Sequence, residues 1–225
     1  MPIIAEDAGY DPNRDKDNRS NESNVKEGVN PLAYLVGPVV VKYGEDPAQR
    51  HVVDLSHYID SQRKTVRAET GEITLNYGEG WCKLDAPKAQ GITGFLKAAG
   101  ECRLTDIEIR STNDYATVLV VAMDNKRLKE SGKILVQVGT TERSLGWKTK
   151  PITIEGRAGQ QVVSFGHAPW MIVRADVEIA IANPALKTAH VLDANGMPVN
   201  ERPLEGSAGR RTFRFPSDAL SVVLE

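Results

Sequence analysis

The sequence has no long hydrophobic run and almost no excess of charge. None of its 225 residues belongs to a stretch approaching the roughly 20 consecutive apolar residues that a membrane-spanning helix needs. The 28 basic and 30 acidic side chains are scattered and give a net charge of −2. No basic stripe therefore predicts binding to phosphate backbones or to anionic lipid. We expect neither nucleic acid nor a membrane among its partners.

The amino terminus also lacks the features of a secretory signal. The first residues, Met1-Pro-Ile-Ile-Ala-Glu-Asp7, contain neither a basic region nor an apolar stretch of the required length. Localisation stays open between a cytoplasmic protein and a segment of a longer exported one.

Cysteine is nearly absent. Cys82 and Cys102 are the only two, and without nearby histidines they cannot complete the four-ligand set of a structural zinc site. Both stand in alternating segments, which is typical of small buried side chains. A disulfide between them is the open alternative.

Helical periodicity is scarce, and short segments with period-two alternation dominate from Leu32 onward. In Arg103–Arg110 the apolar Leu104, Ile107 and Ile109 stand apart from charged neighbours, as a strand with one wet face requires. Turn-forming sequences such as Tyr77–Gly80 and Asp193–Gly196 separate such segments. The sequence therefore predicts an all-β fold, an antiparallel β-sandwich that is either jelly-roll-like or divided into two small packed sandwiches.

Individual elements follow from the same patterns. A β-branched strand is predicted over Tyr34–Tyr43, and single helical turns over Asp54–Ile59 and Leu128–Ser131. Residues 1–30 are rich in Asp, Asn, Arg and Ser and are predicted to be a polar, irregular segment. Residues 31–225 are predicted to form the β-sandwich domain, with a polar, Gly-rich stretch at 143–160 that is either a long loop or a division between two halves.

Five oxygen-bearing side chains of the polar segment match the spacing of a calcium-binding loop. They occupy positions 1, 3, 5, 7 and 12 of that template: Asp11, Asn13, Asp15, Asp17 and Glu22. Lys16 stands where the sharp turn requires glycine, and no amphipathic helix flanks the segment. It is therefore either a Ca²⁺ loop or a solvated acidic loop, and no other cofactor is expected.

Carboxylates are the one catalytic option that the sequence leaves. There is no Gly-x-Ser-x-Gly motif for nucleophilic catalysis. Glu69 and Glu72 flank a predicted turn, and glycosidic bond cleavage needs only two carboxylates about 5 to 10 Å apart. The alternative is a solvated turn tip, so whether the chain is an enzyme stays open.

Aromatic side chains are few, at 6% of the residues, so their positions matter. Rings on turns can stack on the apolar face of a sugar while nearby polar groups bind its hydroxyls. The candidates for carbohydrate binding are Trp81, Tyr77 and Trp147, with Asn76, Glu79 and Arg143 as polar partners. Packing in the core is the alternative for each ring.

Several segments together resemble the β-rich region that follows the catalytic barrel in some large bacterial glycoside hydrolases. The resemblance rests on residues 30–43, on Thr70-Gly-Glu-Ile-Thr-Leu-Asn-Tyr-Gly-Glu-Gly80, on residues 85–95, and on the Ala-Thr-Val-Leu-Val-Val and Leu-Val-Gln-Val-Gly-Thr-Thr strands that begin at Ala116 and Leu135. Near the end of the chain, two further segments resemble the closing hairpin and strand of such sandwiches: Leu192–Gly196 and Leu220–Glu225.

This resemblance implies a non-catalytic accessory module of carbohydrate-active machinery, similar to a carbohydrate-binding module. Its expected partner is a polysaccharide or oligosaccharide, or a glycoside hydrolase catalytic domain on which it packs. None of the family's catalytic acids can be assigned to a position in this chain. Two alternatives stay open: a small β-sandwich glycoside hydrolase using Glu69 and Glu72, and a structural or oligomerising domain.

Overall fold

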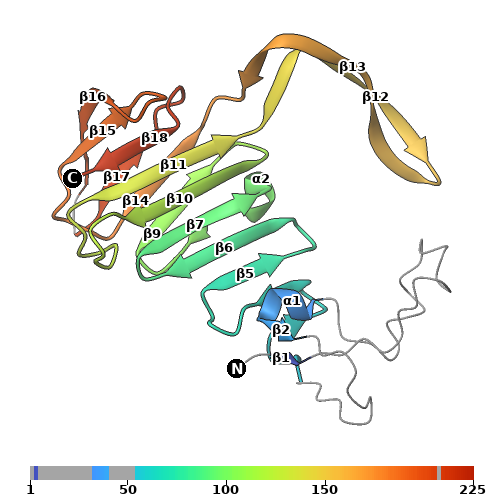
Figure 1. The fold of residues 1–225 in the computed structure, drawn as a ribbon, viewed down its shortest axis with the longest axis horizontal. Helices are drawn as coiled ribbons and strands as arrows, with labels where there is room; N and C mark the ends of the chain where they lie inside the picture. The colour runs from blue at the N-terminus through green and yellow to red at the C-terminus, as the bar shows by residue number, and fades with distance from the viewer. Residues whose placement is uncertain (1–2, 5–31, 41–53, 207–208) are drawn as a thin grey trace. The chain divides into compact units, whose positions relative to one another are not determined.

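A computed structural model describes residues 3–4, 32–40, 54–206 and 209–225 (Figure 1). These residues form mostly antiparallel strands, which confirms the predicted all-β fold. The chain divides into two compact units, Met1–Leu84 and Asp85–Glu225. None of the described helices is long and apolar enough to cross a membrane. The predicted polar segment at 1–30 lies outside the described residues except for Ile3 and Ile4.

The first unit contains a parallel strand pair and an antiparallel meander. Strand β1 (Ile3–Ile4) pairs in parallel with β2 (Val39–Val40). The meander consists of β3 (Ile59–Asp60), β4 (Thr65–Arg67), β5 (Ile73–Asn76) and β6 (Trp81–Ala86), each paired with the next. The last two residues of β6 lie beyond the boundary of this unit. Helix α1 (Ala33–Val36) adds the buried Ala33 and Val36 to a small core that also contains Leu55 and Val66.

The strand predicted over Tyr34–Tyr43 is wrong in its first half. Ala33 and Val36 are three residues apart, so one helical turn directs both toward the small core. The helical turn ends where the Gly37 N–H donates to the Ala33 carbonyl at 3.2 Å. The segments predicted as helical turns at 54–59 and 128–131 form single hydrogen-bonded turns that do not continue into helices. The Leu55 carbonyl accepts the N–H groups of Tyr58 and Ile59 at 2.9 and 3.0 Å, and the Arg127 carbonyl accepts the Glu130 N–H at 2.9 Å.

The second unit is an antiparallel β-sandwich. Its larger sheet has the strand order β16-β15-β18-β11-β10-β7, and its smaller sheet has the order β17-β14-β9-β8. The bounds in the larger sheet are β7 (Ala89–Gly94), β10 (Ala116–Ala122), β11 (Ile134–Thr140), β15 (Thr188–Leu192), β16 (Pro198–Pro203) and β18 (Ser221–Leu224). Those in the smaller sheet are β8 (Cys102–Arg103), β9 (Ile107–Ser111), β14 (Val177–Ile181) and β17 (Arg211–Arg214). The short helix α2 (Leu96–Ala99) follows β7.

Aliphatic side chains at alternate positions form the interior of this sandwich. Every second residue of the central strands is buried, whereas its neighbours are more exposed. The fully buried members include Ile107, Ile109, Val118, Val120, Ile134, Val136, Ile179, Ile181 and Leu224. Burying this apolar surface between two sheets is the main source of stability in a sandwich.

A third pair of strands belongs to the second unit but to neither sheet. Strands β12 (Glu142–Ile154) and β13 (Arg157–Ile172) form a long antiparallel hairpin, and within the described residues neither strand pairs with any other (Figure 1). Residues 143–160, where the sequence left a loop or a division open, lie in this hairpin. Both cysteines are thiols, with Cys82 half-buried and Cys102 buried.

A buried amide ties the end of β14 to the connection between β10 and β11. Asn183 is fully buried, and its Nδ2 donates to the carbonyls of Leu128 and Ser131, each at 2.8 Å. Its Oδ1 accepts from the Ala185 N–H at 3.1 Å. Both polar atoms of the Asn183 side chain therefore form hydrogen bonds with backbone groups that are not paired in any strand.

Replacing Asn183 by aspartate should destabilise the protein severely. The substitution keeps the shape but sets a carboxylate oxygen against two carbonyl oxygens, so we expect the free energy of unfolding at neutral pH to fall by about 2 to 4 kcal/mol. Urea denaturation followed by circular dichroism measures this. Asn200→Asp, on the exposed strand β16, is the control and should change the value by less than about 0.5 kcal/mol. Equal effects of the two variants would contradict the role of Asn183.

Candidate binding groove

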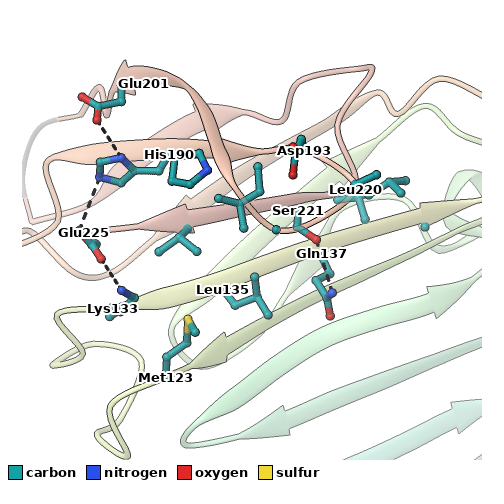
Figure 2. A pocket seen from close by; sticks show the side chains of 17 residues that line it. Met123, Lys133, Leu135, Gln137, His190, Asp193, Glu201, Leu220, Ser221 and Glu225 are labelled. Atoms are coloured by element: carbon teal, nitrogen blue, oxygen red, sulfur yellow. Dashed lines mark hydrogen bonds and ion pairs between the residues drawn. The ribbon is translucent and has the colours of Figure 1, made fainter.

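Three neighbouring strands of the larger sheet present a second set of side chains on the face opposite the sandwich interior. Because successive residues of a strand point to opposite faces, burial of Val136 on β11 and of Val222 on β18 turns Leu135, Gln137 and Ser221 outward. Val223 lies on the same face but is itself buried. On β15 the same alternation turns His190 and Leu192 outward. These side chains form one continuous surface (Figure 2).

This surface is the floor of a groove. The groove has a volume of about 1070 Å³, which is the size of a typical site for a small molecule or a short oligomer. Leu135, Leu192 and Val223 supply an apolar floor, and Gln137 and Ser221 add polar groups whose Nε2 and Oγ lie 3.5 Å apart. The walls include Met123, Lys133, Leu220 and part of the β15–β16 hairpin.

A row of charged groups lies along one side of the groove. Lys133 Nζ lies 2.9 Å from Glu225 Oε1, and His190 lies between two carboxylates, with Nε2 3.6 Å from Glu225 and Nδ1 3.2 Å from Glu201 (Figure 2). The hydrogen bond from Lys133 is the main cause that lowers the pKa of Glu225 below its ordinary value. These groups hold one another in place and leave further donor and acceptor sites toward solvent.

The β15–β16 hairpin forms one wall because its turn is fixed by a carboxylate. Asp193 Oδ1 accepts the N–H groups of Met197 and Asn195, both at 2.8 Å, and these bonds lower the pKa of Asp193. Gly196, at φ +80°, supplies the left-handed residue of this turn. The turn thus brings Pro198 and Glu201 over the edge of the groove.

The aromatic candidates in the first unit are held within a turn. Asn76 Oδ1 accepts the N–H groups of Gly78 and Glu79 at 2.9 and 2.8 Å, and Glu79 Oε2 accepts the Trp81 Nε1–H at 2.7 Å. Lys83 Nζ lies 4.7 Å above the Trp81 ring. Tyr77 is exposed beside them. Asn76, Glu79 and Trp81 therefore lie together, and their polar groups stabilise the β5–β6 turn.

The candidates in the second unit lie on the β12–β13 hairpin. Trp147 packs edge-to-face on Phe165, with ring centres 5.6 Å apart, and the Arg143 guanidinium lies 5.2 Å from the Trp147 ring centre. Trp170, which the sequence analysis did not select, is the most exposed of the three tryptophans at 65%.

The remaining candidates are carboxylates. Glu69 lies beside Gly37, and its N–H donates to the Val36 carbonyl at 2.8 Å. The Glu72 N–H donates to Thr70 Oγ1 at 3.4 Å across the predicted turn. Within the described part of the chain, no three His, Cys, Asp or Glu side chains are grouped to hold a metal ion. The candidate calcium ligands, Asp11, Asn13, Asp15, Asp17 and Glu22, lie outside the described residues.

The groove residues were missed because no short motif contains them. Gln137, His190 and Ser221 come from three strands that are distant in sequence and become neighbours only through the pairing of β18 with both β11 and β15. The signal that could have identified them is the alternation pattern, in which the polar Gln137 and His190 stand between aliphatic residues of two strands.

Removing Lys133 should raise the pKa of Glu225. The Lys133→Met variant deletes the hydrogen bond that lowers this pKa, so an NMR titration of the Glu225 carboxyl should show its midpoint moving up toward the ordinary value. A lowered pKa in the folded state stabilises the protein above the unfolded-state pKa, and this contribution is lost as pH falls through the folded-state pKa. The variant should therefore lose this small acid-sensitive contribution. Lys129→Met, at an exposed position, is the control, and an unchanged Glu225 midpoint in Lys133→Met would contradict the assignment.

Known proteins give no direct guide to what the groove binds. No protein-family model, no curated protein and no solved structure matches this chain. The chemistry of the groove therefore has to indicate its ligand.

Proposed function

We propose that this chain is a non-catalytic accessory module of carbohydrate-active machinery that binds polysaccharide in the groove formed by β11, β18 and β15. The observation that carries the proposal is the composition of this groove. Hydrogen-bonding side chains stand over an apolar floor on a rigid sheet face.

A sugar ring presents hydroxyl groups around its rim and C–H groups on its faces. Gln137 and Ser221 both donate and accept hydrogen bonds, and Glu201 and Glu225 accept them. Leu135 and Val223 match the C–H faces. Among the described residues that line the groove there is no Trp, Tyr or Phe, so binding here would rest on hydrogen bonds and aliphatic contact.

The sheet supports such a role because it fixes the polar groups before a ligand arrives. Each carrying strand pairs with a neighbour on both sides, as β18 does with β11 and β15. The side chains on the other face are locked in the sandwich interior. A preorganised site loses less entropy when it binds a flexible polymer. The resemblance of the sequence to the accessory region of bacterial glycoside hydrolases supports the same class of ligand.

Affinity electrophoresis through gels that contain a panel of plant and algal polysaccharides tests the proposal. We expect at least one polysaccharide to retard the chain, with no release of reducing sugar. Gln137→Leu should weaken that retardation about fivefold to thirtyfold, since one or two hydrogen bonds of about 1 kcal/mol each are lost. Because Gln137 is exposed, the variant should fold normally.

Two sets of variants separate the groove from the sites that the sequence suggested. Trp81→Ala and Trp147→Ala should leave retardation unchanged, whereas loss of retardation in these variants alone would move the site to the rings. Release of reducing sugar that Glu69→Gln or Glu72→Gln abolishes would favour the hydrolase alternative. A chain that no polysaccharide retards would leave packing on a catalytic domain or a structural role.

A further inference from the structure

The β12–β13 hairpin exposes an unusual share of the chain's large apolar side chains. Among the described residues, eighteen large hydrophobic side chains are exposed, and seven of them lie in β12 or β13. Phe165 and Trp170 are 74% and 65% exposed, and no residue of β13 is buried. A two-stranded hairpin alone is at best marginally stable in water, and a third strand or a packing partner is what stabilises it.

The two strands of this hairpin differ in charge. Strand β12 carries Glu142, Arg143, Lys148 and Lys150, and Pro151 follows. Charged side chains and proline on an edge strand prevent pairing with another chain. Strand β13 carries Arg157 at its first residue and no other Asp, Glu, Lys or Arg, and its single proline, Pro169, lies near its far end. The outer edge of β12 is thus protected, whereas β13 has no such residue between Ala158 and Ala168.

One part of β13 is regular enough to accept another strand. Register shifts between Lys148 and Thr149 and between Ser144 and Leu145 interrupt the ladder. The longest uninterrupted stretch of β13 is Arg157–Val162, paired residue by residue with Thr149–Ile154. Gln160 and Gln161 lie in its middle and are exposed.

We propose that two copies of this chain associate through the outer edge of β13, forming a four-stranded antiparallel sheet in the order β12-β13-β13-β12. A twofold axis pairs each strand with its own copy in the antiparallel direction. With the axis near the middle of the regular stretch, Arg157 of one copy lies opposite uncharged residues at the other end of the stretch in its partner, so this pairing brings no like charges together along β13.

Charge selects this arrangement over pairing through β12. Pairing through β12 would set Lys148 and Lys150 of the two copies about 5 Å apart on adjacent strands. In the proposed order the two β12 strands are separated by three strand spacings, about 14 Å, which exceeds the screening length of about 8 Å at physiological salt. The cations on β12 therefore disfavour a dimer paired through the β12 edge but not one paired through the β13 edge.

Sedimentation velocity of the full chain over a range of concentrations tests this inference. We expect a concentration-dependent dimer. The double variant Gln160→Lys/Gln161→Lys adds a cation to each face of β13 and should weaken the dimer at least tenfold. The matching Gln160→Glu/Gln161→Glu variant should do the same, and an equimolar mixture of the two should restore a dimer containing one of each.

Thr149→Lys/Thr153→Lys is the matched control, because it adds the same two charges to exposed positions of β12. It should change dimerisation less than threefold. A chain that stays monomeric at every concentration, a dimer that survives both β13 double variants, or equal disruption by the β12 control would each overturn the proposal. The lysine variant of β13 counts as folded if a polysaccharide retards it as much as it retards the unchanged chain. If no polysaccharide binds the chain, an unchanged circular dichroism spectrum shows the same.

Discussion

The structure of the second unit depends on one constraint, the burial of alternate aliphatic side chains between two antiparallel sheets. Ile109 and Ile179 on the smaller sheet and Val120 and Val136 on the larger sheet are all but inaccessible to water. Because a strand has only two faces, each buried residue fixes the direction of its neighbours. The groove is a result of this rule, since Gln137 lies between the buried Val136 and Val138. A shift of the β11 register by one residue would turn Gln137 into the sandwich interior and remove it from the groove.

Buried polar groups define how the sheets are connected. Asn183 binds the connection after β10, and Gln90 on β7 accepts the Asp106 N–H at 3.0 Å just before β9. Hydrophobic burial is not directional, so it favours a sandwich without selecting one arrangement of its loops. These amides do select one, because any other arrangement would leave them buried without partners.

Sequence patterns were sufficient for the fold class and for the β5–β6 and β15–β16 turns, since both depend on interactions between near neighbours. Tyr34–Val36 was misassigned because β-branched composition is a weaker determinant than packing of Ala33 and Val36 on the small core of the first unit. The 143–160 region reads as either a long loop or a division between two halves, because its glycines and charges suit both, and only the pairing of Glu142–Ile154 with Arg157–Ile172 shows two strands. The groove required strand order, which a single sequence does not provide.

The Asp193 turn has a consequence for how such a module can change. All hydrogen bonds of that carboxylate to the turn are made within five residues of chain, so the wall it supports owes little to the sandwich interior. Residues 194–201 can therefore be exchanged or lengthened while the apolar interior stays intact. A library confined to this hairpin would sample new groove shapes on a constant scaffold, which makes it the natural segment for altering ligand preference by design.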